Sequence, residues 1–238
     1  MNDFKKINLL GVGFTNASKQ EILEFIYTGL QSSTKRYYIV TPNPELLVLA
    51  NKDKNYKTVL NNAKLALADG VGVILASSFL GKPLKQRITG VDLTESLCNY
   101  VSKRPITVSF LGGGPKVAEL TAECLHKKYP GLKVSWAAKE YDKSLKNKKT
   151  DILFVAFGSP KQEVWIARNL ENLNVGVVIG VGGAFDFITG KVPRAPKFLQ
   201  NLGLEWLFRL IIQPWRVKRQ LSLIKFIILV LKEKITYN

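Results

Sequence analysis

Short runs of β-branched and aromatic residues alternate along this chain with segments of helical periodicity, and turns rich in Gly and Pro separate the two kinds of segment. The runs expected to form strands are residues 37–40, 106–111, 132–134, 151–156 and 175–181. Strands joined by helical segments of about 10–15 residues form βαβ units and therefore a parallel sheet. We expect residues 1–190 to form one α/β domain with a Rossmann-like parallel sheet and helices on both faces.

Turns containing Gly or Pro follow several of these strands, and we expect the functional site among them, because ligands of parallel sheets bind beyond the carboxyl ends of the strands. Gly112 and Gly113 follow one strand and open a helix, where backbone N–H groups and the helix dipole can hold a pyrophosphate. The dinucleotide fingerprint G-x-G-x-x-G is broken at Val117, which disfavours a nicotinamide-dependent oxidoreductase. The alternative for these residues is a tight turn that needs glycine.

The C-terminal segment, residues 191–238, differs in composition from the rest of the chain. It carries ten Lys and Arg against two Glu, nearly half of the chain's net charge of +17, with large apolar residues interleaved. We expect Pro214 to divide it into two shorter amphipathic helices. Basic residues beside large aromatic ones are typical of a helix that lies on an anionic membrane surface. The alternative is a solvated basic helix that packs on the core.

The sequence favours a cytoplasmic protein. The most apolar stretch, residues 221–231, is 11 residues long and contains Lys225, whereas a membrane span needs about 20 apolar residues. The two cysteines, Cys98 and Cys124, are too few for a disulfide framework, which indicates a reducing compartment.

The sequence offers few residues for metal binding or nucleophilic catalysis, but it offers one candidate general base. His126 is the one histidine, it has no partner at ligand spacing, and no Asp-x-Asp pair exists to hold Mg²⁺ or Mn²⁺. Asp69 follows an apolar run and precedes Gly70, so partial burial would raise the pKa of its carboxyl group and make it a better base near neutral pH. The alternative is that Asp69-Gly70 forms a simple turn.

Several motifs in register resemble one family. The motifs are TPNPE (41–45), DGVGV (69–73), RITGVD (87–92), GSPKQE (158–163), GVGGAFD (180–186), RAP (194–196), EWLFRL (205–210) and PWR (214–216). In this order and spacing they resemble the TagA/WecG/CpsF glycosyltransferase family over nearly the whole chain. The resemblance implies an inverting, metal-independent enzyme without a cofactor, which moves a sugar, most often N-acetylmannosamine, from a UDP-sugar to an undecaprenyl-diphosphate-linked sugar. Enzymes of this family take part in building wall teichoic acid, enterobacterial common antigen or capsule.

The resemblance also implies roles for residues in the α/β domain. Asp69 would take the proton from the acceptor hydroxyl, and Thr41 and Asn43 would hold the sugar or assist the base. Arg87 would stabilise the departing diphosphate, as the absence of an Asp-x-Asp pair requires. The residues placed around the donor are Gln162 and Asp186, together with the glycine turn at Gly112 and Gly113.

In the C-terminal segment, the family's appendage docks on the membrane and completes the site. We expect Arg216 and Arg219, three residues apart on one helix, to bind the acceptor's diphosphate, with Arg209 one helix earlier. The expected partners are the UDP-sugar, the lipid-linked acceptor and an anionic membrane surface at the inner face of the plasma membrane. A homo-oligomer is compatible with the sequence.

A nucleic-acid-binding protein is the alternative of another class, since it too would explain a net charge of +17. Two observations disfavour it. The charge is concentrated in an apolar C-terminal segment, and the chain contains no helix-turn-helix, zinc-finger or RNP motif. We therefore expect no nucleic-acid partner.

Overall fold

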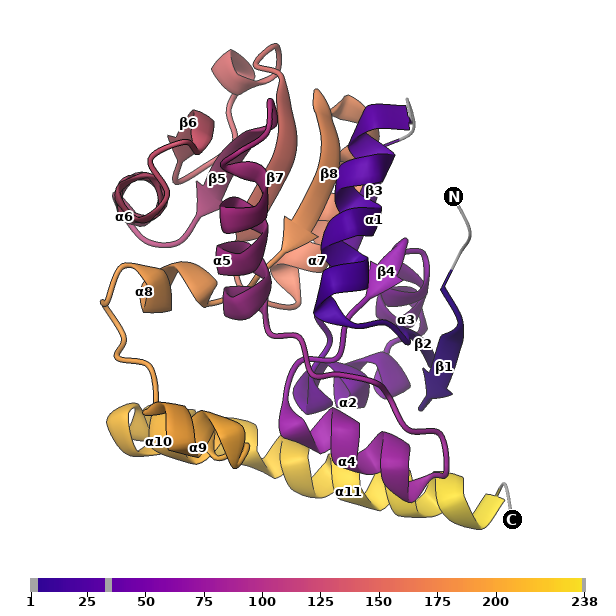
Figure 1. Cartoon of the computed structure of the whole chain (residues 1–238). Coiled ribbons are helices and arrows are strands. Elements are labelled where there is room, and N and C mark those ends of the chain that lie inside the picture. Colours follow the sequence, from indigo (N-terminus) through magenta and orange to yellow (C-terminus); the bar gives the residue numbers. More distant parts are fainter. Residues whose placement is uncertain (1–3, 33–35, 237–238) are drawn as a thin grey trace.

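The computed structural model describes residues 4–32 and 36–236, without the side chains of residues 143, 201, 216 and 218–220. Six parallel strands form the central sheet in the order β4-β3-β8-β7-β5-β6 (Figure 1). Their bounds are β3 (Tyr37–Val40), β4 (Leu65–Ala66), β5 (Thr107–Gly112), β6 (Lys133–Ala138), β7 (Thr150–Ala156) and β8 (Val175–Gly180). The predicted parallel α/β sheet is confirmed, and the strand boundaries differ from the expected ones by a few residues at most.

Helices cover both faces of the sheet, as predicted. Because successive side chains of a strand point to opposite faces, Phe110 and Phe154 belong to one apolar core, whereas Leu111 and Val155 belong to the other. The helices that contribute buried residues to the first core are α1 (Lys19–Ser32), α5 (Gly90–Val101), α6 (Val117–Lys128) and α8 (Ala184–Ile188). Those of the second core are α2 (Pro44–Lys52), α3 (Lys54–Asn61), α4 (Val71–Phe79), α7 (Lys161–Asn169) and α11 (Val217–Thr236).

The short apolar run near the N-terminus forms an antiparallel hairpin of β1 (Lys6–Leu9) and β2 (Val12–Thr15), outside the central sheet. Its turn consists of Leu10 and Gly11, which have φ angles of 54° and 79°. Two successive residues in this left-handed region are typical of the tight turns that join antiparallel strands. This hairpin was not predicted from the sequence.

The C-terminal segment contains α9 (Lys197–Asn201), α10 (Glu205–Ile212), a 3₁₀ turn (Pro214–Arg216) and α11. The break expected at Pro214 is confirmed. Helix α11 runs alongside α4 and α2 (Figure 1) and buries Phe226 and Val230 in the second core. At its far end, the Glu233 carboxylate accepts a hydrogen bond from the backbone N–H of Leu10, over 2.8 Å.

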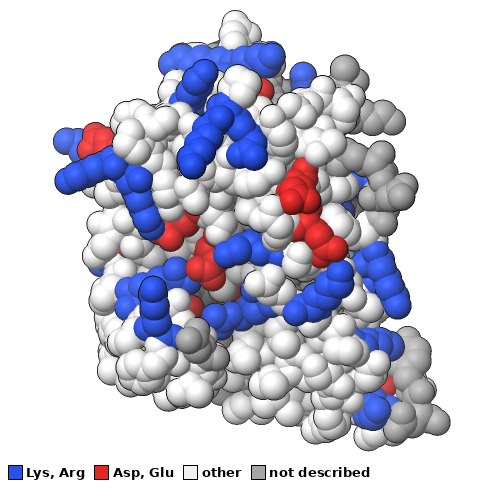
Figure 2. Space-filling view, viewed as in Figure 1, with Lys and Arg blue, Asp and Glu red and all other residues white. Residues whose placement is uncertain are grey.

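Helix α11 therefore has one face packed on the α/β domain, while many of its large apolar side chains stay exposed. In Figure 2, Lys and Arg are spread over the face of the molecule that is seen in Figure 1, and the strip along α11 is mainly uncharged up to its C-terminal end. No helix in the described part of the chain is long and apolar enough to cross a membrane.

Gly90, the first residue of α5, lies against β8. A Cβ atom added at Gly90 would lie 2.7 Å from the carbonyl oxygen of Val181. We predict that Gly90→Ala lowers the free energy of unfolding by about 1–3 kcal/mol, because the backbone must shift to relieve this contact. The control is Gly13→Ala, whose Cβ would meet only side-chain atoms, the nearest of them on the flexible Lys6 at 3.3 Å and the other on Asn61 at 3.9 Å. Equal urea unfolding curves for the two variants would contradict the prediction.

Candidate active site

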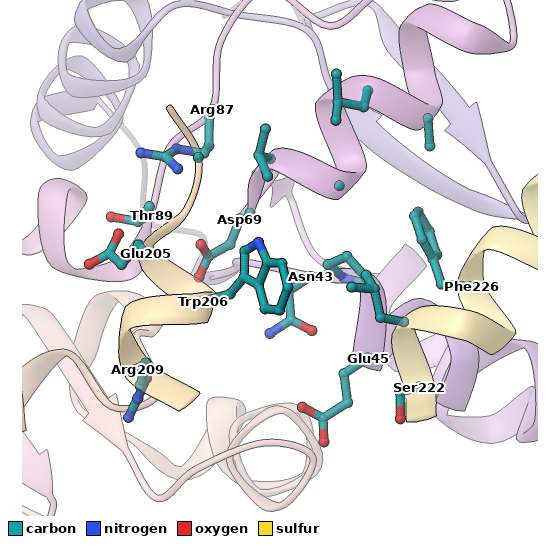
Figure 3. A pocket seen from close by; sticks show the side chains of 18 of the residues that line it. Asn43, Glu45, Asp69, Arg87, Thr89, Glu205, Trp206, Arg209, Ser222 and Phe226 are labelled. Atoms are coloured by element: carbon teal, nitrogen blue, oxygen red, sulfur yellow. The ribbon is translucent and has the colours of Figure 1, made fainter. Parts of the chain in front are cut away.

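A pocket of about 690 Å³ lies between the ends of β3 and β4 on one side and the C-terminal helices α10 and α11 on the other. Four of the predicted site residues line it (Figure 3), namely Asn43, Asp69, Arg87 and Arg209. The C-terminal segment therefore supplies one wall of the pocket, and the turns after the strands supply the other.

The chain after β4 fixes Asp69 by continuing the strand pairing. The N–H of Leu67 donates to the Val40 carbonyl over 2.9 Å, and the N–H of Asp69 donates to the Pro42 carbonyl over 3.0 Å. The next residue, Gly70, has a φ of 96°, a conformation that glycine adopts without strain. This glycine turns the chain from Asp69 into α4, so the carboxyl group stays at the wall of the pocket.

The environment of Asp69 keeps its carboxyl group near the point of ionisation at neutral pH. Burial is the main cause that raises the pKa of Asp69 to about 7, and the negative charge of Glu205 is the next. Arg87 and a hydrogen bond from the Gly90 N–H act in the opposite direction. A carboxylate with a pKa near the working pH is well suited to act as a general base.

Arg194 joins α10 to α5 beside this carboxyl group. Its Nη2 lies 2.7 Å from the Oδ1 of Asp92 in α5, and its Nε lies 3.4 Å from the Oε1 of Glu205, the first residue of α10. Thr89 caps α5 and donates to the other Asp92 oxygen over 2.8 Å. The ion pairs therefore hold Glu205, the residue that raises the pKa of Asp69, at the mouth of the pocket.

Thr41 and Asn43 occupy the first turn after β3. The buried Thr41 hydroxyl donates to the Gly180 carbonyl over 3.2 Å and so joins the ends of β3 and β8. The Oδ1 of Asn43 accepts from the N–H of Leu46 over 3.1 Å and caps α2. The cap uses the amide oxygen, so the amide NH₂ is the part of Asn43 that is suited to donate to a ligand.

Two guanidinium groups reach the pocket from different parts of the chain. Arg87 comes from the loop before α5 and donates to the Gln200 carbonyl over 3.2 Å. Arg209 comes from α10, and its guanidinium carbon lies 4.7 Å from the centre of the Phe187 ring. The side chains of Arg216 and Arg219 lie outside the described part of the structure, so their predicted role stays a prediction.

Gln162 is buried beside the pocket and does not line it in the described structure. Its Oε1 accepts from the N–H of Gly182 over 3.0 Å, and its Nε2 donates to Glu163 over 2.7 Å. The second oxygen of Glu163 accepts from the Tyr56 hydroxyl over 3.2 Å. In this structure Gln162 thus holds the turn after β8, and its expected donor contact stays a prediction.

The remaining predicted donor residues, Gly112, Gly113 and Asp186, are likewise absent from the described lining of the pocket. A Cβ at Gly112 would lie 2.8 Å from the carbonyl carbon of Ala156, and the N–H of Gly113 donates to the Ala156 oxygen over 2.9 Å. The glycines therefore let this turn approach the end of β7. The backbone carbonyl of Asp186 accepts from Val192 over 3.0 Å.

Several pocket residues were not singled out in the sequence. They include Glu45, Thr89, Glu205 and Trp206, all within quoted motifs, and Phe226, which lies outside them. No group of three His, Cys, Asp or Glu suited to a metal ion occurs in the described part of the chain. His126 lies 3.1 Å through its Nδ1 from the Leu132 carbonyl, in line with a structural role.

A carboxyl group that ionises near neutral pH, set between guanidinium groups in a deep pocket, is suited to remove a proton from a hydroxyl group while an anionic group departs. At the carboxyl ends of a parallel sheet, such a pocket defines an α/β enzyme of the group-transferase class. Residues 7–238 match the "Glycosyl transferase WecG/TagA/CpsF family", and the chain belongs to this family of glycosyltransferases.

Named relatives agree with this assignment. The chain is 34% identical over 237 residues to an N-acetylglucosaminyldiphosphoundecaprenol N-acetyl-beta-D-mannosaminyltransferase of Bacillus spizizenii, covering 97% of this chain and 91% of the relative. A Staphylococcus aureus protein of the same name is 32% identical, covering 96% of this chain and 93% of the relative. A Bacillus subtilis protein of that name is 36% identical over 203 residues, covering 82% and 79%.

We predict that Arg194→Gln loosens α10, because it leaves the partly buried Asp92 and Glu205 without their shared cation. The free energy of unfolding should fall by about 1–3 kcal/mol, and chymotrypsin should cut faster at Trp206 and Phe208. The control is Lys128→Gln, which removes an exposed ion pair with Glu95 and should cost at most about 1 kcal/mol. Unchanged cleavage of the Arg194 variant would contradict this account of the ion pairs.

Proposed function

We propose that this enzyme transfers N-acetylmannosamine from a UDP-sugar to a sugar carried on undecaprenyl diphosphate, with inversion and without a metal ion. The observation that carries the proposal is the Asp69 carboxyl group, which has a pKa of about 7 and lines a pocket that also contains Arg87. The names of the relatives supply the sugar and the lipid carrier. A role in wall teichoic acid, common antigen or capsule synthesis follows from that reaction.

The reaction is a single displacement. Asp69 accepts the proton of the acceptor hydroxyl, and the hydroxyl oxygen attacks the anomeric carbon of the donor sugar. The bond from that carbon to the UDP oxygen breaks with both electrons on the oxygen, so UDP leaves as an anion. In this proposal Arg87 neutralises the charge of the leaving UDP, and the Asn43 amide holds the sugar. One displacement inverts the configuration of the anomeric carbon.

The lipid carrier places the reaction at a membrane. The acceptor's diphosphate lies at the level of the lipid headgroups, and each Lys or Arg near an anionic leaflet adds about 1 kcal/mol of attraction. The C-terminal helices contribute exposed apolar residues such as Ile211 and Trp215. These features support peripheral association with the inner face of the plasma membrane.

We predict that Asp69→Asn lowers acceptor-dependent UDP release by about 10²–10⁴-fold, the usual contribution of a general base. The assay uses UDP-N-acetylmannosamine and lipid-diphosphate-N-acetylglucosamine in detergent with EDTA. The control is Asp53→Asn, the same isosteric change at a helix cap, where asparagine also caps well. Loss of wild-type release in EDTA would contradict the metal-independent mechanism, and full activity of Asp69→Asn would contradict the assignment of the base.

The pH dependence provides a test with a defined sign. The base acts in its ionised form, so kcat/KM should rise with pH through about 7. Glu205→Gln removes a negative charge that raises the pKa of Asp69, and it should move this rise to lower pH. Arg87→Gln removes a positive charge and should move it to higher pH. Shifts in the same direction in both variants would contradict the assignment of the titrating group to Asp69.

A further inference from the structure

The pocket does not end at Asp69 but continues as an apolar groove between α4 and α11. Leu75, Ala76 and Phe79 of α4 form one side of this α4/α11 groove, and Phe226, Ile227 and Leu231 of α11 form the other. The charged residues that line the pocket in the described structure come from other segments, and none comes from α4 or α11. One continuous cavity therefore has a polar end and an apolar end.

The groove has a buried floor and exposed rims. Ala76 and Phe226 are buried, whereas the exposed fractions are 63% for Leu75, 51% for Phe79 and 52% for Ile227. Large apolar side chains aligned on both rims of a groove are costly to leave in water and mark a binding surface. The side chains on the floor are shielded from solvent, and those on the rims are placed to cover an apolar ligand.

Contacts in the middle of α11 and near its C-terminal end hold this helix against the rest of the fold. Near the pocket, a Cβ at Gly72 would lie 3.0 Å from Pro44 of α2, 3.8 Å from the Phe226 ring and 3.9 Å from Leu223, so α4 is packed there against both α2 and α11. Near the C-terminal end of α11, Glu233 accepts the hydrogen bond from the N–H of Leu10. The groove is therefore part of the folded structure.

We propose that the α4/α11 groove binds the first isoprene units of the acceptor's polyprenyl chain. The inference rests on the proposed function, because that acceptor joins a sugar and a diphosphate to a long hydrocarbon. Helix α4 has nine residues and is about 13 Å long, enough for a few isoprene units.

The side from which the acceptor must approach supports a polyprenyl chain as the ligand of the groove. In a displacement with inversion, the acceptor approaches from the side opposite to the leaving group. Figure 3 shows Arg87, the residue placed to neutralise the leaving diphosphate, on one side of Asp69 and Phe226 of the groove on the other. An acceptor hydroxyl at Asp69 then has its hydrocarbon on the side where the wall of the pocket is apolar.

Two adjacent residues of α11 make it possible to distinguish a ligand site in the groove from a general membrane-contacting surface. Ile227 lines the groove and is 52% exposed, whereas Ile228 does not line it and is 47% exposed. An aspartate at either position brings the same charge to the same helix, and neither side chain is part of the buried core. Ile228→Asp is therefore a matched control for Ile227→Asp.

The experiment measures, by calorimetry in detergent-free buffer, the dissociation constants of farnesyl diphosphate and inorganic pyrophosphate for the full chain. The wild type should bind farnesyl diphosphate more tightly. Ile227→Asp should reduce this preference about tenfold, the loss expected when roughly two methylene groups are kept out of an apolar site. Ile228→Asp should keep the preference, and Leu75→Asp, on the opposite rim, should repeat the effect of Ile227→Asp. Taking the ratio of the two constants cancels repulsion between the new aspartate and the diphosphate.

Three outcomes would overturn the proposal. The first is equal affinity of the wild type for the two ligands, and the second is an equal loss of preference in Ile227→Asp and Ile228→Asp. The third is displacement of farnesyl diphosphate by phosphatidylglycerol vesicles, which would assign the groove to bilayer lipid. Failure of the transfer reaction is a separate result, because a farnesyl preference that persists without UDP release contradicts the proposed function and leaves an isoprenoid site.

Discussion

The burial of one ionisable group, the Asp69 carboxyl, organises the functional half of this molecule. Burial favours the protonated form of a carboxyl group, whereas the proposed role of Asp69 as a base requires it to ionise near neutral pH. The structure balances these demands with Arg87 and the Gly90 N–H on one side and Glu205 on the other. Arg87 and Gly90 lie three residues apart at the start of α5, whereas Glu205 belongs to α10, so the environment of Asp69 depends on how the turn after β4, the start of α5 and α10 meet.

Much of the fold could be predicted from the sequence, because parallel strands that are buried on both faces consist of continuous apolar runs bounded by Gly and Pro. The break at Pro214 has an equally local cause. The β1–β2 hairpin has no such local signal, since its apolar run contains Asn8 and two glycines and shows no clear hydrophobic periodicity. The position of α11 was also beyond a local pattern, because its contact with α4 joins segments far apart in the chain.

The candidate site could likewise be predicted from the sequence only in part. Asn43 and Asp69 lie in turns at the ends of β3 and β4, and the parallel sheet brings such turns together, whereas Arg87, in the loop between α4 and α5, was identified from the family resemblance alone. Arg194 and Glu205 lay within quoted motifs without a role, because their importance arises from ion pairs that exist only after folding. The interpretation of the C-terminal segment as a membrane-facing surface rested on composition, which does not indicate that Phe226 and Val230 are buried against the α/β domain.

The hydrogen bond between Leu10 and Glu233 has a consequence for the folding of the protein during its translation. Its two residues are 223 positions apart, so at about 5–20 residues per second, translation needs roughly 10–45 s to supply the second partner after the first. The parallel sheet precedes α10 and α11 in the chain and can form while they are still being made. Until α10 and α11 have been made, the nascent chain therefore lacks the wall that these helices supply to the pocket beside Asp69.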